Sequence, residues 1–159
     1  MPEVFVGIGS NADPAAALRA AVAALEQRCS AVVCSSVYRS PAIGLRAADY
    51  LNMVVALHTA EPASALPEAL HAIETRAGRR RSDPAVVELD LDLLLYGSRV
   101  DAELRLPRPG LFTLPFVLGP LAELAPQLVH PVTGELCGAA WRAAPHGALA
   151  RLGTLRLLA

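Results

Sequence analysis

The chain has 159 residues, 53% of them hydrophobic, and its 14 basic and 15 acidic residues leave a formal net charge of −1. This length suits one domain with its own core, here residues 1–159. The near-neutral charge argues against nucleic acid or a membrane surface as a partner, because such proteins carry a clear basic excess. All 14 basic residues are Arg, which excludes the Lys-dependent phosphate-binding loop and Schiff-base enzymes.

The sequence gives little indication of a membrane span, a signal peptide, a disulfide framework or a cysteine-bound zinc site. No apolar run approaches the roughly 20 residues needed to span a bilayer, and Met1–Glu3 leads into a strand-like segment rather than a basic signal-peptide start. The three cysteines form no Cys-x-x-Cys pair, which fits neither a disulfide framework nor a zinc site. We therefore expect a cytoplasmic protein.

The first half of the chain alternates strand and helix signals. The short apolar run Val4–Ile8 ends in a glycine and predicts a buried strand. Asp13 before Pro14 predicts a capped helix that runs to Gln27. The elements expected next are an extended segment at 31–38, a strand at 50–59, and a helix that starts at Glu61-Pro62 and ends at Gly78.

The second half begins with a segment that has no apolar period. Residues 78–87, which we call the arginine loop, contain Arg79-Arg80-Arg81. Period-two alternation from Glu88 then predicts a strand to Gly97, followed by a hairpin-like stretch at 98–104 and a helix at 116–124. The tail has only weak signals. Alternating strands and helices with short connections predict a layered α/β or α+β sandwich.

Asp90 and Asp92 are the most informative polar pair. Side chains two residues apart leave the same face of a strand roughly 6–7 Å from each other, so the two carboxylates can share hard cations. A solvent-facing pair without function is the simpler alternative. The adjoining arginine loop favours a ligand, because Mg²⁺ uses carboxylates plus substrate phosphates and Arg forks suit phosphate oxygens. The combination predicts a phosphoryl-transfer site.

Other candidate residues are less specific. His71 lies three residues before Glu74 on the second expected helix, where solvated surface is the simpler interpretation. The turn Gly9-Ser10-Asn11 lacks the spacing of a dinucleotide-binding loop. The remaining histidines have no partner at metal-ligand spacing, which argues against a zinc site.

Several segments form an ordered set over about residues 4 to 131. They are Gly9-Ser10-Asn11, Ser36-Val37-Tyr38-Arg39-Ser40-Pro41 with Gly44, Asp49-Tyr50-Leu51-Asn52, Ile73-Glu74 before Gly78-Arg79, Leu89 to Gly97, and Phe116-Val117-Leu118 with Pro120-Leu121. In this order and with this spacing, they resemble the 6-hydroxymethyl-7,8-dihydropterin pyrophosphokinases of folate synthesis. The resemblance implies an α+β fold, a ferredoxin-like sandwich in which helices cover a single mixed or antiparallel sheet.

The resemblance also implies a reaction and its residues. The family transfers pyrophosphate from ATP to the hydroxymethyl group of the pterin and releases AMP, with two Mg²⁺ ions held by the pair corresponding to Asp90 and Asp92. It implies a monomer with small-molecule partners only. The implied pterin-binding residues are Ser40, Pro41, Ile43, Tyr50, Asn52 and Phe116, and the implied ATP-binding residues are His71, Glu74, Arg79 and Arg81, with both arginines also acting in catalysis.

The chain departs from the family at phosphate-facing positions. Val87 stands where the family has an arginine, and Leu114 stands where it has a basic residue shortly before Phe-Val-Leu. The family's Pro-His-Pro reads Pro107-Arg108-Pro109, so Arg108 is a candidate replacement cation on the ATP side.

Three hypotheses remain open at this point. The first is an active Mg²⁺-dependent pyrophosphokinase acting on hydroxymethyl-dihydropterin. The second is a relative that acts on a related pterin alcohol in another one-carbon-carrier pathway. The third is a non-catalytic pterin- or nucleotide-binding protein whose phosphate clamp has decayed.

Overall fold

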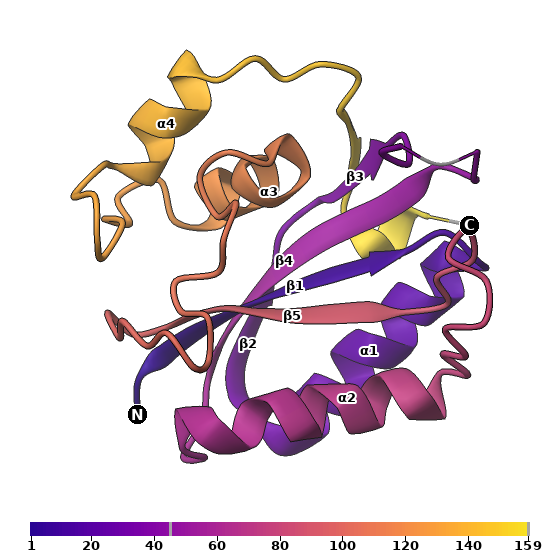
Figure 1. Cartoon of the computed structure of the whole chain (residues 1–159), viewed down its shortest axis with the longest axis horizontal. Coiled ribbons are helices and arrows are strands. Elements are labelled where there is room, and N and C mark those ends of the chain that lie inside the picture. The colour runs from indigo at the N-terminus through magenta and orange to yellow at the C-terminus, as the bar shows by residue number, and fades with distance from the viewer. Residues whose placement is uncertain (45, 159) are drawn as a thin grey trace.

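The computed structural model describes residues 1–44 and 46–158, which fold into one sheet with helices on both faces (Figure 1). The elements in chain order are β1 (Glu3–Ser10), α1 (Pro14–Arg28), β2 (Ser30–Cys34), β3 (Val37–Ser40), β4 (Tyr50–His58), the 3₁₀ turn η1 (Ala63–Ala65), α2 (Leu66–Arg76), β5 (Asp90–Tyr96), α3 (Pro115–Leu124), α4 (Cys137–Ala143), β6 (Ala150–Gly153) and the 3₁₀ turn η2 (Leu155–Leu157). Among these helices, none combines the length and the apolar character needed to cross a membrane.

The sheet topology is that of a ferredoxin-like fold. The strand order is β5-β1-β4-β3-β6, with β2 also paired to β4, and all of these pairs are antiparallel. From β1 to β5 the chain follows a βαββαβ path in which β2 and β3 share the place of the second strand. The first strand of this path, β1, therefore lies between its third strand, β4, and its fourth strand, β5. This confirms the predicted α+β ferredoxin-like sandwich.

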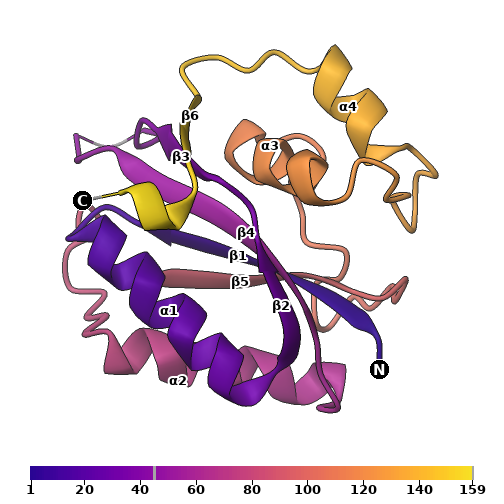
Figure 2. The same cartoon turned by 180° about the vertical axis from the view of Figure 1, so that it is seen from behind.

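Each face of the sheet has its own hydrophobic core. Helices α1 and α2 cover one face, and α3 and α4 cover the other (Figure 1 and Figure 2). Successive side chains of a strand point to opposite faces. Thus Val4, Val6 and Ile8 of β1 join the larger core beneath α1 and α2, whereas Phe5 joins the smaller core beneath α3 and α4.

The segment 31–38, expected as one extended run, is interrupted at Ser35 and Ser36. The Ser35 Oγ accepts a hydrogen bond from the backbone N of Val54 at 2.9 Å, and the backbone N of Ser36 donates to Glu123 at 2.9 Å. Side-chain oxygens thus replace the backbone carbonyls that would accept these two hydrogen bonds in a regular sheet, and the run divides into β2 and β3.

Two helix starts differ from the sequence prediction. Asp13 precedes α1 but makes no side-chain cap hydrogen bond, because its backbone is left-handed (φ 46°, ψ 55°) rather than extended as capping requires. The second helix begins after Glu61, because Pro62 is extended (ψ 151°) and the 3₁₀ turn η1 precedes α2.

The weakly patterned tail contributes α4, β6 and the 3₁₀ turn η2 to the fold. β6 pairs with β3 and extends the sheet. Trp141 of α4 packs against Gly119 of α3, where a Cβ atom would lie 3.0 Å from the indole ring, and it stacks on His146 with ring centroids 3.5 Å apart. The tail therefore holds α3 against the sheet.

Candidate active site

A pocket of about 270 Å³ lies on the α3 side of the sheet, where β1 lacks side chains. Its floor includes Gly7 and Gly9. In the strand register Gly9 lies between Asn52 of β4 and Asp90 of β5, and Asp92 lies beside Gly7. Because glycine has no side chain, the space between the amide and the two carboxylates stays open. The volume is near the lower end of the roughly 300–1,000 Å³ typical of small-molecule sites.

All six residues expected to contact the pterin line this pocket, together with both aspartates. They are Ser40, Pro41, Ile43, Tyr50, Asn52 and Phe116, which come from β3, the loop after it, β4 and α3. Ile43 is 73% exposed and lies where the loop borders solvent. An aromatic ring, a hydroxyl and an amide thus converge on one apolar cavity beside the two carboxylates, which suits a flat polar heterocycle.

The amide of Asn52 is fixed in place within the pocket. Asn52 is buried, and its Nδ2 donates a hydrogen bond to the Ser40 Oγ at 2.8 Å. Its Oδ1 lies over Gly9, where a Cβ atom would be only 2.9 Å away. The side chain therefore presents a donor and an acceptor whose orientation the surrounding strands determine.

Asp90 and Asp92 leave β5 on the pocket side and are paired with arginines. The Nη1 of Arg79 lies 3.5 Å from the Asp90 Oδ1, and the Nη2 of Arg108 lies 2.8 Å from the Asp92 Oδ1. Burial raises the pKa of Asp92, the negative charge of Asp90 raises it further, and Arg108, Arg105 and Arg79 oppose the rise. Two close carboxylates of this kind require positive charge between or around them.

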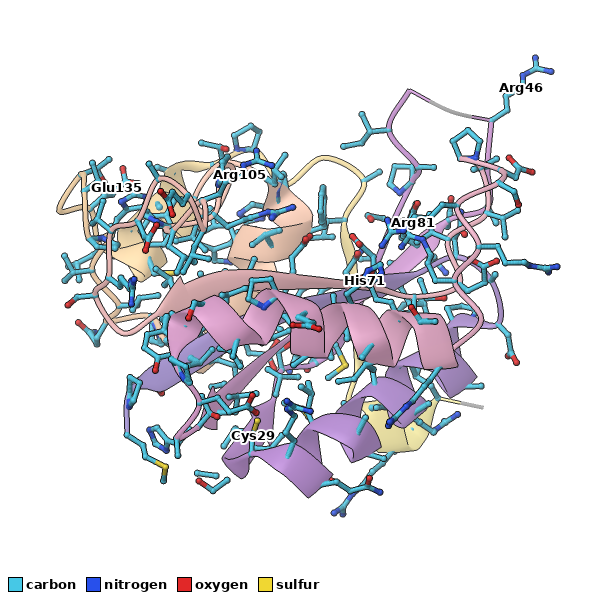
Figure 3. All side chains as sticks on the ribbon, turned by 60° about the horizontal axis from the view of Figure 1, so that its bottom comes forward. Cys29, Arg46, His71, Arg81, Arg105 and Glu135 are labelled. Carbon is cyan, nitrogen blue, oxygen red and sulfur yellow. The ribbon has the colours of Figure 1, made fainter. Side chains whose placement is uncertain are left out.

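Glu74 is the buried centre of an ion-pair cluster between α2 and the arginine loop. Its carboxylate lies 3.7 Å from the Nη1 of Arg79 and 3.4 Å from the Nη2 of Arg81. The same Arg81 nitrogen is 3.4 Å from the Nδ1 of His71, and Figure 3 shows these two side chains close together above α2. Burial, with the charge of Asp90, raises the pKa of Glu74, and Arg81 and Arg79 counter this effect. Four of the five residues expected on the ATP side are therefore gathered here, and the fifth, Arg108, lies beside Asp92.

The two positions with missing cations have structural roles. Val87 is buried, its backbone N donates to the Asn11 Oδ1 at 2.7 Å, and its carbonyl accepts from the Asn11 backbone N at 3.0 Å. Asn11 also donates to the carbonyl of Ala85 at 2.8 Å, so it anchors the arginine loop to the end of β1. Leu114 packs on Gly110, where a Cβ atom would lie 2.6 Å from a Leu114 methyl group.

Three contributions to the site were not recognised in the sequence. Gly7 and Gly9 are two residues apart on one strand, a spacing that signals a gap on one face. Asn11 belongs to a turn and to the family resemblance in the sequence, but neither indicates that its side chain holds a loop 74 to 76 residues away. The positive charge of Arg105 opposes the rise in the pKa of Asp92, but this effect depends on tertiary packing and no sequence signal indicates it.

The donor set of the site fits magnesium. Side chains of Asp90 and Asp92 are 44% and 34% exposed and leave one face of β5, so hard oxygen ligands are accessible from the pocket. The arrangement also suits phosphate. The buried Nε of Arg79 has no hydrogen-bond partner among the described residues, which is costly unless a ligand supplies an acceptor.

Comparisons with known proteins show the family of the chain. Residues 5–126 match the family model of 7,8-dihydro-6-hydroxymethylpterin-pyrophosphokinase. The chain is 39% identical over 155 residues to the 2-amino-4-hydroxy-6-hydroxymethyldihydropteridine pyrophosphokinase of Synechocystis sp., covering 88% of this chain and 80% of the relative. It is 40% identical over 138 residues to the enzyme of the same name from Methylorubrum extorquens, covering 81% of this chain and 86% of the relative.

Solved structures show the same fold at low sequence identity. The HPPK-DHPS protein of Plasmodium falciparum superposes with a TM-score of 0.69 at 9% identity, and the match covers 89% of this chain. This chain spans only 44% of that longer protein. The match to the family model and the identities to its relatives place the chain in the 7,8-dihydro-6-hydroxymethylpterin-pyrophosphokinase family.

Proposed function

We propose that the protein transfers a pyrophosphoryl group from ATP to the hydroxymethyl group of 6-hydroxymethyl-7,8-dihydropterin and releases AMP, a step of folate biosynthesis. The observation that carries the proposal is that one pocket combines an aromatic and amide-lined cavity with Asp90 and Asp92, beside the arginine loop. Family membership, shared with relatives that carry this enzyme name, supports the same conclusion.

The pterin would occupy the apolar part of the pocket. The ring of Phe116 provides a surface for stacking on a flat heterocycle, and the fixed amide of Asn52 matches the donor and acceptor groups along the pterin edge. Ser40, which accepts the Asn52 hydrogen bond, keeps that amide in orientation. In this pose the hydroxymethyl group extends toward the two aspartates.

ATP would bind where the arginine loop meets α2. Arg79 and Arg81 lie beside Asp90 and Glu74 and can form charge-assisted hydrogen bonds to the phosphates, and Arg108 provides a third cation next to Asp92. Asp90 and Asp92 would hold two Mg²⁺ ions. Bound Mg²⁺ neutralises phosphate charge and favours the attacking form of the hydroxyl.

In the reaction, the hydroxymethyl oxygen bonds to the β-phosphorus of ATP while the bond from that phosphorus to the oxygen retained by AMP breaks. The hydroxyl proton is released. The chain's own contribution is to align the oxygen with the phosphorus and to surround the transferred group with positive charge. Asn52 and Phe116 serve the alignment, and the arginines serve the charge.

The test is to incubate the protein with ATP, Mg²⁺ and the pterin alcohol and to measure AMP. We expect AMP release that falls on the order of 100-fold or more in Asp90→Asn and Asp92→Asn. The variant Asp101→Asn is the control and should keep full activity, because Asp101 bonds Arg99 and the backbone of its own turn and does not line the pocket. If no AMP forms with this substrate but another pterin alcohol is converted, the protein is a pyrophosphokinase for that other alcohol. If the protein binds the pterin without turnover, it is a binding protein rather than an enzyme.

A further inference from the structure

Glu123 joins three elements through one partly buried carboxylate. Its Oε1 accepts hydrogen bonds from the backbone N of Ser36 at 2.9 Å and from the Ser36 Oγ at 2.8 Å, and its Oε2 accepts from the Tyr38 Oη at 2.7 Å. The Nε of Arg151 in β6 lies 3.4 Å from the same Oε2. Hydrogen bonds to an ionised acceptor are about twice as strong as neutral ones, so this group firmly attaches α3 to β3.

Two of the three elements that Glu123 joins, α3 and β3, also contribute residues to the pocket lining. Phe116 and Val117 line it from α3, and Ser40 lines it from the end of β3. Phe116 and Glu123 are seven residues apart, or about two helical turns, and so lie on the same face of α3. The carboxylate therefore acts at one end of the helix and the pterin pocket lies at the other.

The pocket end of α3 depends strongly on such tertiary contacts. Pro120 has no backbone N–H, so the carbonyl of Phe116 lacks its regular helical partner. Leu114, at the N-cap position, makes no side-chain cap hydrogen bond. With weakened local support, the position of Phe116 follows from how the whole helix is fastened to the sheet.

We propose that Glu123, held by Ser36 and Tyr38, is a positioning residue that fixes α3 relative to β3 and thereby sets the width of the pterin pocket. This inference rests on the proposed function, because it concerns how the pocket accepts its pterin. It also gives a role to Ser36 and Tyr38. Both belong to the segment 36–41 that contributes to the family resemblance, but they do not line the pocket themselves.

The experiment compares four proteins by steady-state kinetics and by calorimetric pterin binding. Glu123→Ala removes the carboxylate. Glu123→Gln keeps an acceptor for Ser36 and can donate to the Tyr38 hydroxyl, so it is the rescue variant. Glu61→Ala is the matched control, because Glu61 is similarly exposed (26% against 28%) and also bonds an arginine, Arg28, but on the α1 side of the sheet.

We expect Glu123→Ala to raise the KM and Kd for the pterin roughly tenfold, with kcat and ATP binding changed less than about threefold. Glu123→Gln should restore the pterin KM to within about threefold of wild type, and Glu61→Ala should not change it. Should Glu123→Ala not fold, Tyr38→Phe, which removes one bond, should shift the pterin KM in the same direction.

Two results overturn the inference. If the wild type is active and both Glu123→Ala and Tyr38→Phe have the same pterin KM as the wild type, the positioning role alone is refuted and the proposed function stands. A wild type that neither binds nor converts the pterin refutes the proposed function and the positioning role together. Wild-type binding without turnover refutes only the reaction, and the Kd values then decide the role of Glu123.

Discussion

Replacing Gly9 by Ala should weaken pterin binding while the fold is largely retained. The new Cβ would lie 2.9 Å from the Asn52 Oδ1, too close for any real contact. Asn52 is buried and bonded to Ser40, so its amide can move only by losing that bond. The lost hydrogen bond costs about 0.5–1.5 kcal/mol of stability, and the reduced backbone entropy of alanine in the unfolded chain offsets about 0.4–1 kcal/mol of this.

The effect on the pterin should be larger than the effect on stability. A displaced amide forfeits one or two hydrogen bonds to the substrate, about 1–3 kcal/mol in total, which corresponds to a roughly 5- to 150-fold weaker Kd. Calorimetric titration measures the Kd, and urea unfolding measures the stability. Gly7→Ala is the comparison variant, because it adds a methyl group to the same pocket floor but its Cβ would meet Leu94 at an ordinary 3.5 Å and would not contact Asn52. Equal Kd values for Gly9→Ala and wild type, or an equal loss in Gly7→Ala, would refute the role assigned to Asn52.

Three further predictions concern charges and the arginine loop. Arg108→Ala should strengthen Mn²⁺ binding in the absence of nucleotide, measured by electron paramagnetic resonance, because the substitution frees Asp92 from its ion pair. The same variant should weaken ATP binding roughly tenfold. Mn²⁺ and ATP affinities that change in the same direction would contradict this prediction. Asn11→Ala should speed tryptic cleavage in the arginine loop roughly tenfold, because it removes the two hydrogen bonds between the Asn11 side chain and the loop, one to the Ala85 carbonyl and one from the Val87 backbone N; an unchanged rate would refute the anchor. The hydrogen bond from Arg28 lowers the pKa of Glu61, so its stabilisation is present above the ordinary carboxyl pKa near 4.5 and is lost as pH falls through the lower folded value. Urea unfolding of wild type should therefore lose more stability on acidification than that of Glu61→Gln, and identical pH profiles would count against the pair.

Local patterns were sufficient to predict the framework of the fold. Apolar segments at Val4–Ile8 and Tyr50–Thr59 predicted β1 and β4, and alternation from Glu88 placed Asp90 and Asp92 on one face of β5. These patterns succeed because burial determines them: β1 and β4 are buried on both faces and are apolar along most of their length, whereas β5 alternates where the Asp90 and Asp92 face borders the pocket.

The rest depends on contacts between distant segments. The division of residues 31–38 into two strands requires Glu123, which is 87 residues from Ser36 and contributes a carboxylate in place of a ladder bond. β6 is only four residues long, and its pairing with β3 is not indicated by its own composition. The neutralisation of Asp92 by Arg108 likewise arises only once the loop before α3 folds back on β5.

The most direct test of the proposed reaction follows the β-phosphate of ATP. With ATP labelled at that phosphorus, hydroxymethyl-dihydropterin and Mg²⁺, the account predicts that the label moves to the pterin as a diphosphate and that AMP forms in equal amount. It also predicts that Asp92→Asn slows the transfer on the order of 100-fold or more. Label that stays on the nucleotide while ADP accumulates would contradict it, because transfer of a single phosphoryl group leaves the β-phosphorus behind.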